Sequence, residues 1–161
     1  MHSEWVNDER LTAIGLFAEA YEGLIARFAA QLAEHQLAPI EFEVLMRLAR
    51  SPEGMLRMTD LSAQTTLTTS GVTRVIDRLN RDGLVCRRAC ATDRRSWYAV
   101  ITADGRTRLD AVLPGHLALI EEWFIGRLDR DQLDAMIGAL RAVRDAVRPD
   151  ATAGSALPSG G

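Results

Sequence analysis

The feature that most constrains the fold is a stripe of apolar residues in the N-terminal segment. Between residues 8 and 34, apolar side chains recur at alternating steps of three and four, which places them along one side of a helix. A helix this apolar is overexposed in a monomer, and its natural cover is the same surface on a second subunit. The residues are Leu11, Ile14, Ala18, Tyr21, Ile25, Phe28 and Leu32, widened by Leu16, Phe17 and Leu24.

The middle of the chain predicts three shorter helices. The first begins at Pro39, because proline fits the first turn of a helix. Two more are expected at about 58–64 and 69–82, separated by a threonine-rich turn. The hydroxyl of Thr68 suits the N-cap of the third helix, and Gly83 suits its C-terminal end. This order of elements is typical of a helix-turn-helix.

The pattern then changes to strands. Residues 84–90 and 97–101 are rich in strand-forming side chains and flank a polar loop, which predicts a β-hairpin with a charged tip. Residues 55–57 are a candidate third strand. After residue 102 the helical pattern returns, with a last helix that carries Leu133 to Val147. The fold class is therefore mainly α with a small β-hairpin wing.

The charge of the chain is unevenly distributed. The formal net charge is −3, and every basic residue is arginine. The segment from Val72 to Arg108 contains nine arginines and four acidic residues, whereas the rest of the chain contains ten arginines and eighteen acidic residues. A basic centre between acidic ends indicates a local nucleic-acid footprint.

Several classes of protein are excluded. No apolar run is long enough to span a bilayer, and the N-terminus lacks the pattern of a secretory signal, so we expect a cytoplasmic protein without membrane contact. The histidines His2, His35 and His116 have no metal-ligand spacing, and no catalytic motif is found. We therefore expect no catalytic residues, no metal and no cofactor.

A winged helix-turn-helix of this composition suits double-stranded DNA. Thr68, Thr69 and Ser70 place hydroxyl and N–H groups at the positive end of the third helix, where phosphate oxygens bind. Thr73 and Arg74 lie opposite the buried face of that helix and can reach base edges. Two arginines at the hairpin tip, Arg94 and Arg95, suit a narrow minor groove.

These residues also resemble the MarR family of bacterial transcription regulators. The resemblance covers about Pro39 to Leu109, in five blocks of the right order and spacing. Two departures, Ser62 for the usual alanine and Asn80 for a common glutamate, are compatible with the fold. The blocks are Leu61-Ser62-Ala63, residues 67–79 (LTTSGVTRVIDRL), Gly83-Leu84-Val85, Asp93-Arg94-Arg95 and residues 101–105 (ITADG).

The resemblance implies a homodimer whose N- and C-terminal helices intertwine, with a pseudo-palindromic operator. It implies a dimerisation helix over residues 1–36, a winged helix-turn-helix over 37–103 and dimerisation helices over 104–148. The composition of residues 149–161, rich in Ala, Gly, Ser, Thr and Pro, predicts a disordered tail. In such a wing, Asp93 orients Arg95. Many members are repressors that release DNA when a small aromatic or phenolic ligand binds. Trp5 is a candidate for that ligand site, because some urate-type members carry an N-terminal tryptophan there.

Two alternatives are weighed against this interpretation. The chain could be a helical dimeric module whose winged helix binds protein rather than DNA, although the basic centre argues against it. Cys86 and Cys90 could form a redox switch, but four residues of strand span roughly 13 Å, well beyond the ~4.4–6.8 Å between the Cα atoms of a disulfide. We therefore expect two semi-buried cysteines without a switching role.

Overall fold

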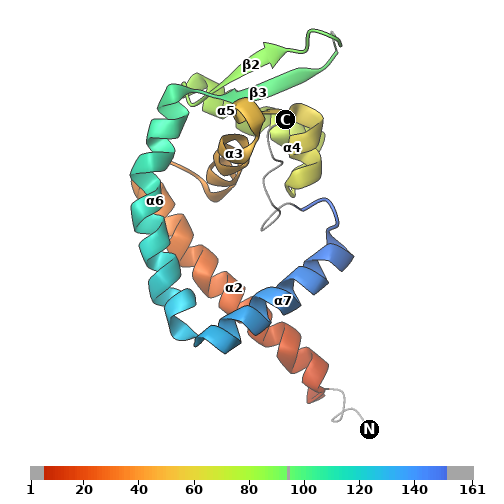
Figure 1. Ribbon diagram of the computed structural model, residues 1–161, viewed down its shortest axis with the longest axis vertical. Helices are drawn as coiled ribbons and strands as arrows, with labels where there is room; N and C mark the ends of the chain where they lie inside the picture. Colours follow the sequence, from red (N-terminus) through yellow and green to blue (C-terminus); the bar gives the residue numbers. More distant parts are fainter. Residues whose placement is uncertain (1–5, 94, 152–161) are drawn as a thin grey trace.

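The computed structural model describes residues 6–93 and 95–151 of the protein. It is mainly helical with one small antiparallel sheet, which confirms the predicted fold class (Figure 1). In chain order the elements are α2 (Glu9–Glu34), α3 (Pro39–Arg50), the 3-10 turn η1 (Pro52–Gly54), β1 (Met55–Arg57), α4 (Met58–Gln64), α5 (Thr69–Arg81), β2 (Val85–Ala89), β3 (Trp97–Ile101), α6 (Ala103–Trp123), the 3-10 turn η2 (Ile125–Arg127) and α7 (Arg130–Val147).

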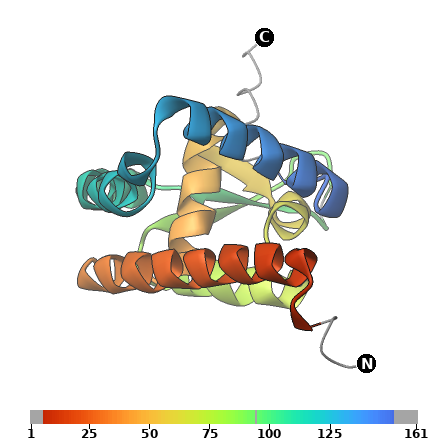
Figure 2. The same cartoon turned by 90° about the horizontal axis from the view of Figure 1, so that it is seen from below.

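The helices α2, α6 and α7 form an extended arm, and the elements from α3 to β3 form a winged part at one end of it (Figure 1). α6 leads from the sheet along the arm, and α7 turns back towards α4 (Figures 1 and 2). In α2 only Leu32 is buried, and in α7 no residue is. The arm therefore presents uncovered apolar side chains, notably Leu11, Ile14, Leu16, Phe17 and Tyr21 on α2 and Ile137, Leu140, Val143 and Val147 on α7.

The wing is a three-stranded sheet in the order β1-β3-β2. β3 lies in the centre and pairs antiparallel with both neighbours, so that Val100 is opposite Met55 on one side and Cys86 on the other. The short third strand predicted at residues 55–57 is therefore confirmed. Because β1 leads directly into α4, the sheet fixes where the helix-turn-helix begins.

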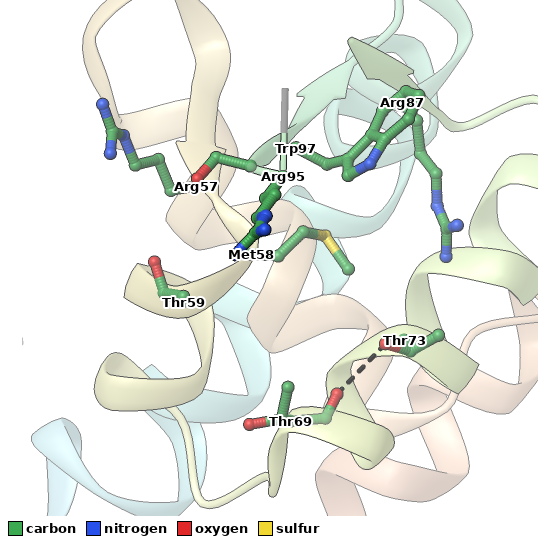
Figure 3. Close-up of a pocket in the computed structure, with 9 residues that line it drawn as sticks. Arg57, Met58, Thr59, Thr69, Thr73, Arg87, Arg95 and Trp97 are labelled. Atoms are coloured by element: carbon green, nitrogen blue, oxygen red, sulfur yellow. Dashed lines mark hydrogen bonds between the residues drawn. The ribbon is translucent and has the colours of Figure 1, made fainter. Parts of the chain in front are cut away.

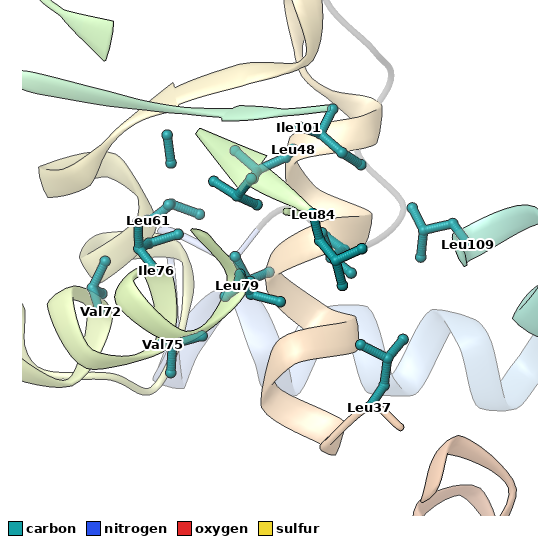
Figure 4. Packing of buried hydrophobic residues seen from close by; sticks show 14 of the residues in the cluster. Leu37, Leu48, Leu61, Val72, Val75, Ile76, Leu79, Leu84, Ile101 and Leu109 are labelled. Atoms are coloured by element: carbon teal, nitrogen blue, oxygen red, sulfur yellow. The ribbon is translucent and has the colours of Figure 1, made fainter. Parts of the chain in front are cut away.

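A single apolar core joins the winged part to the start of α6 (Figure 4). α5 contributes the face predicted from its sequence, since Val72, Val75, Ile76 and Leu79 are all buried. The other side of the helix is left to solvent. The core partners include Leu48 of α3, Leu61 of α4, Leu84, Val85, Ile101, Leu109 and Val112.

The ends of α5 have the predicted caps. The Thr68 hydroxyl accepts a hydrogen bond from the Gly71 backbone N–H at 3.1 Å. At the other end Gly83 adopts a φ of 74°, a left-handed conformation that glycine takes without strain. The Leu84 N–H then donates to the Leu79 carbonyl at 2.9 Å, which ends the helix.

The apolar stripe that runs from Leu109 to Leu128 in the sequence is interrupted in the structure. α6 ends at Trp123, and a 3-10 turn leads into α7, which begins with a capping box formed by Asp129 and Gln132. Gly126 permits this tight turn, because a Cβ at its position would lie 2.6 Å from the Glu121 carbonyl oxygen. In the part of the chain that the structure describes, no helix has the length and hydropathy needed to cross a membrane.

Candidate nucleic-acid interface

A groove of about 240 Å³ separates the start of α5 from the wing (Figure 3). Thr69 and Thr73 lie on its α5 side, and Arg95 reaches into it from the wing (Figure 3). Thr69, Thr73 and Arg95, which the sequence assigned to DNA contacts, come from two distant segments of the chain. The fold brings them together in this groove. The full lining is Arg57, Met58, Thr59, Thr69, Thr73, Arg87, Arg95, Ser96 and Trp97.

The hydroxyl groups at the start of α5 are partly engaged in the helix itself. Thr68 serves as the N-cap, and its Oγ1 lies 3.1 Å from the Ser70 hydroxyl. The Thr73 hydroxyl donates to the Thr69 carbonyl at 3.1 Å (Figure 3). Thr73 can therefore accept a hydrogen bond from a ligand, while its proton is already in use. Thr68 and Ser70 flank the groove without lining it.

Arg74 occupies the solvent side of α5. Its side chain is exposed, and the neighbouring Val72 and Val75 point into the core. Among the described residues no ion pair or hydrogen bond holds its guanidinium group. Arg74 therefore projects from the recognition face, outside the groove, as a donor that is available to a base edge or a phosphate.

Asp93 organises the turn of the wing. One carboxylate oxygen accepts the Arg95 backbone N–H at 3.0 Å, and the other accepts the Ser96 hydroxyl at 2.5 Å. The hydrogen bond from Ser96 has the largest effect on the pKa of Asp93, and together with the bond from Arg95 it holds this pKa below its usual range. Asp93 thus acts on the backbone of Arg95 and not on its guanidinium group. Arg94 lies outside the described residues, as does Trp5.

The groove also includes residues that the sequence did not identify as site residues. Arg57 ends β1, and its Nε donates to the Tyr98 hydroxyl at 3.3 Å while its guanidinium carbon lies 5.6 Å from the ring centroid. Trp97 begins β3 and is 47% exposed. The pairing of β1 with β3 places Arg57 opposite Tyr98, and this long-range register has no signal in the local sequence.

The basic centre is smaller than its count of arginines indicates, because several of them stabilise the fold. Arg78 forms an ion pair with Glu41, and Arg87 forms one with Asp77 at 2.6 Å. Arg108 donates to the His35 carbonyl at 2.9 Å, which places its charge at the C-terminal end of α2. The arginines directed to a partner are thus chiefly Arg57 and Arg95 of the groove and Arg74 on the exposed side of α5.

The cysteines and histidines occupy separate places. Cys86 is exposed and Cys90 is buried, so the expected partial burial of both is wrong: Cys86 lies within β2, whereas Cys90 follows the end of that strand. The hydrogen bond with Thr92 lowers the pKa of Cys90 to about 7. His116 is buried between Phe28 and Phe42, and burial lowers its pKa. In the described ranges no three His, Cys, Asp or Glu side chains are grouped as metal ligands.

Comparison with known proteins identifies this architecture. Residues 35–96 match the sequence model of the MarR family. YkoM of Bacillus subtilis (strain 168), an uncharacterized HTH-type transcriptional regulator, is 33% identical over 127 residues, which cover 78% of this chain and 80% of YkoM. The chain belongs to the MarR family. As a MarR-family protein it is a transcription regulator and not an enzyme.

Solved structures of MarR-family proteins share the whole arrangement. Sco3205 from Streptomyces coelicolor, crystallised in complex with DNA, is 28% identical with a TM-score of 0.82, and the match covers 88% of this chain and 89% of Sco3205. BpsR from Bordetella bronchiseptica is 26% identical with a TM-score of 0.72, over 81% of this chain and 91% of BpsR. The BpsR structure concerns the regulation of its DNA binding by 6-hydroxynicotinic acid.

Proposed function

We propose that this MarR-family regulator is a homodimeric repressor that binds a pseudo-palindromic operator and releases it when a small ligand binds. The observation that carries the proposal is the groove in which the start of α5 faces Arg95 of the wing. A duplex that seats α5 in its major groove brings the adjacent minor groove to the wing. The crystal structure of the related Sco3205 in complex with DNA supports DNA as the partner.

In this proposal α5 is the recognition helix. Thr68, Thr69 and Ser70 lie at its N-terminal end, where backbone N–H groups and the helix dipole favour phosphate oxygens. Arg74 reads a base, with a guanine as the preferred partner of its guanidinium group. Thr73 accepts a hydrogen bond from a base edge or a bridging water, because its proton is held by Thr69.

In the wing, Arg95 enters the minor groove, where the negative potential of a narrow groove attracts arginine. Asp93 accepts hydrogen bonds from the Arg95 N–H and the Ser96 hydroxyl, which fixes the backbone from which the Arg95 side chain extends. We propose the same groove for Arg94 on the basis of the sequence alone. Arg57 lines the protein groove beside Arg95 and is proposed to contact the phosphates between the two duplex grooves, whereas Arg87 stays paired with Asp77.

The arm supplies the second half of the proposal. The exposed apolar residues of α2 and α7 form a surface that an isolated monomer leaves in water, and a second copy covers it through a two-fold interface. We assign dimerisation to residues 1–36 and 104–148, and DNA binding to residues 37–103. Half-site centres then lie about one helical turn apart, on the order of 10 bp.

Ligand release is proposed from the family and from the effect of 6-hydroxynicotinic acid on the related BpsR. A small aromatic or phenolic compound is the proposed class, with Trp5 as a candidate contact in a segment outside the described residues. Regulation of a bacterial operator places the protein in the cytoplasm. The alternative, a winged-helix module that binds protein, leaves the exposed arginines of the groove without a use.

Selection of bound duplexes from a random pool tests the proposal. The expected result is a two-fold-symmetric consensus bound by one dimer, with an affinity that falls steeply as salt rises, because phosphate contacts release counterions. Sedimentation of the complex counts the protomers. Enrichment of no duplex at low salt, or full-affinity binding of a single half-site by a monomer, would refute it.

A further inference from the structure

The C-terminal end of α7, in the arm, contacts the winged part through the side chain of Arg148. Figures 1 and 2 show the end of α7 beside α4, although α7 begins at the opposite end of the arm. The guanidinium Nη2 of Arg148 donates to the backbone carbonyl of Thr65 at 3.0 Å. Thr65 lies in the turn that joins α4 to α5, so the contact links the last helix of the arm to the helix-turn-helix.

The backbone of Arg148 is fixed by its neighbours. Its N–H donates to the Arg144 carbonyl at 2.6 Å, and its own carbonyl accepts the Ala151 N–H at 3.0 Å. Pro149 follows directly, and a residue before proline is driven out of the helical conformation. Arg148 accordingly ends α7 with a φ of −147° and a ψ of 71°. Its side chain therefore starts from a defined position when it crosses to the turn.

The receiving turn is equally well ordered. Thr65 is 4% exposed, and its hydroxyl donates to the Leu61 carbonyl at 2.6 Å and accepts the Leu67 N–H at 3.3 Å. The Ser62 hydroxyl donates to the Leu67 carbonyl at 3.1 Å. The Thr65 carbonyl accepts its hydrogen bond from the charged guanidinium group of Arg148. This bond is stronger than one from a neutral donor, because charge-assisted hydrogen bonds are stronger than neutral ones. Three residues after Thr65, Thr68 caps α5.

We infer that Arg148 is a positioning residue for DNA recognition: it ties the end of α7 to the turn that precedes the recognition helix. In a dimer held together by the arm, this contact makes the separation of the two α5 helices depend on the position of α7. The inference rests on the proposed function, in which a dimer reads two half-sites. Arg148 itself does not line the groove and makes no contact with DNA in this account.

The test compares Arg148→Ala with Arg141→Ala, which removes the same charge from an exposed position on the same helix. Full-length dimers are titrated with the selected operator and with two versions whose half-sites are moved 1 bp closer or further apart. We expect Arg148→Ala to bind the operator about tenfold more weakly, equivalent to about 1.4 kcal/mol, and to distinguish the three spacings less well. Arg141→Ala should match the wild type.

Two further measurements separate positioning from other roles. The slope of log affinity against log salt should be the same as in the wild type, because no phosphate contact is lost. In the absence of DNA, the Leu67 amide should exchange with solvent faster in Arg148→Ala, while Arg148→Lys, which keeps a charged donor, should recover part of the operator affinity and of the spacing preference.

Several results would overturn the inference. Wild-type affinity and spacing preference in Arg148→Ala would show that the contact does not position α5. A flatter salt slope would make Arg148 a phosphate contact, and loss of the dimer by sedimentation would make it an association residue. If the alanine variant does not fold, the lysine variant is compared with the wild type instead. A Leu67 amide that is not protected from exchange in the lysine variant would then count against the inference. Failure of the wild type to bind any duplex would refute the proposed function, and the inference with it.

Discussion

The carboxylate of Glu41 on α3 forms an ion pair with the guanidinium group of Arg78 on α5. Glu41 is 5% exposed, and its other oxygen accepts the Ala38 N–H at 2.7 Å, which completes the cap of α3. One buried side chain thus begins one helix and holds the recognition helix against it. The orientation of α5 depends on this pair as well as on the apolar core.

Replacement of Glu41 by alanine should therefore lower the free energy of unfolding by about 1–3 kcal/mol, the usual cost of leaving a buried hydrogen-bonding group without its partner. Glu41→Gln should lose less, because its amide oxygen can still accept the Ala38 N–H. Urea denaturation measures both. Glu43→Gln is the matched control, since the partly exposed pair of Glu43 with Arg47 on the same helix should contribute about 0–1 kcal/mol. Equal losses for Glu41→Ala and Glu43→Gln would contradict the structural role of Glu41.

Arg95→Ala should weaken operator binding by about 1–3 kcal/mol, because a wing contact to the minor groove is lost. The dimer should stay intact, since Arg95 lies in the wing and not among the exposed apolar residues of α2 and α7. Fluorescence anisotropy gives the affinity and sedimentation gives the oligomeric state. The control is Arg88→Ala, whose side chain is directed to Glu53 and Met55. An affinity unchanged by Arg95→Ala would remove the wing from the interface.

Arg74→Ala should relax the base preference at one position in each half-site. The reason is that its exposed guanidinium group projects from α5, where a bidentate bond to guanine discriminates between bases. Repeating the random-pool selection with the variant reveals the changed position. Arg81→Ala, on the same helix but at its C-terminal end, should leave the consensus unaltered. A uniform loss of affinity over all sequences would instead assign Arg74 to a phosphate.

The protein should lose stability as the pH falls below about 6.5, through His116. Burial between Phe28 and Phe42 keeps the folded-state pKa of His116 below the 6.5 of an unperturbed histidine. In that pH range the unfolded chain binds a proton that the folded chain does not, so acidification favours unfolding. His116→Phe should reduce this pH dependence, measured by urea denaturation between pH 8 and pH 5. An identical pH dependence in the variant would show that other groups cause it.

The helices and strands could be predicted closely because each carries a local signal. The buried face of α5, its Thr68 cap and the turn at Gly83 were all visible in the sequence. The end of α6 was not, because the apolar stripe continues past Trp123, whereas the helix ends there and a tight turn follows at Gly126. The periodicity of apolar residues does not report where the backbone leaves the helix.

The site was predictable only in part, for a related reason. The sequence indicates which side of α5 faces solvent, and so identifies Thr69, Thr73 and Arg74. It does not indicate that Arg57 joins them, because that depends on the register of two strands about forty residues apart. It also does not distinguish arginines that serve the fold, such as Arg78, from those that face a partner.

α7 has a consequence for how the protein behaves when it is scarce. None of the eighteen residues of the helix is fully buried against its own chain, and helices in water gain most of their stability from packing. Its folding is therefore linked to association, and mass action makes the melting temperature rise with protein concentration. A cell that makes little of the regulator thus holds fewer assembled molecules. It also holds a larger fraction of unfolded chains, which are open to proteolysis. Occupancy of the operator therefore responds to the expression level more steeply than the binding equilibrium alone would dictate.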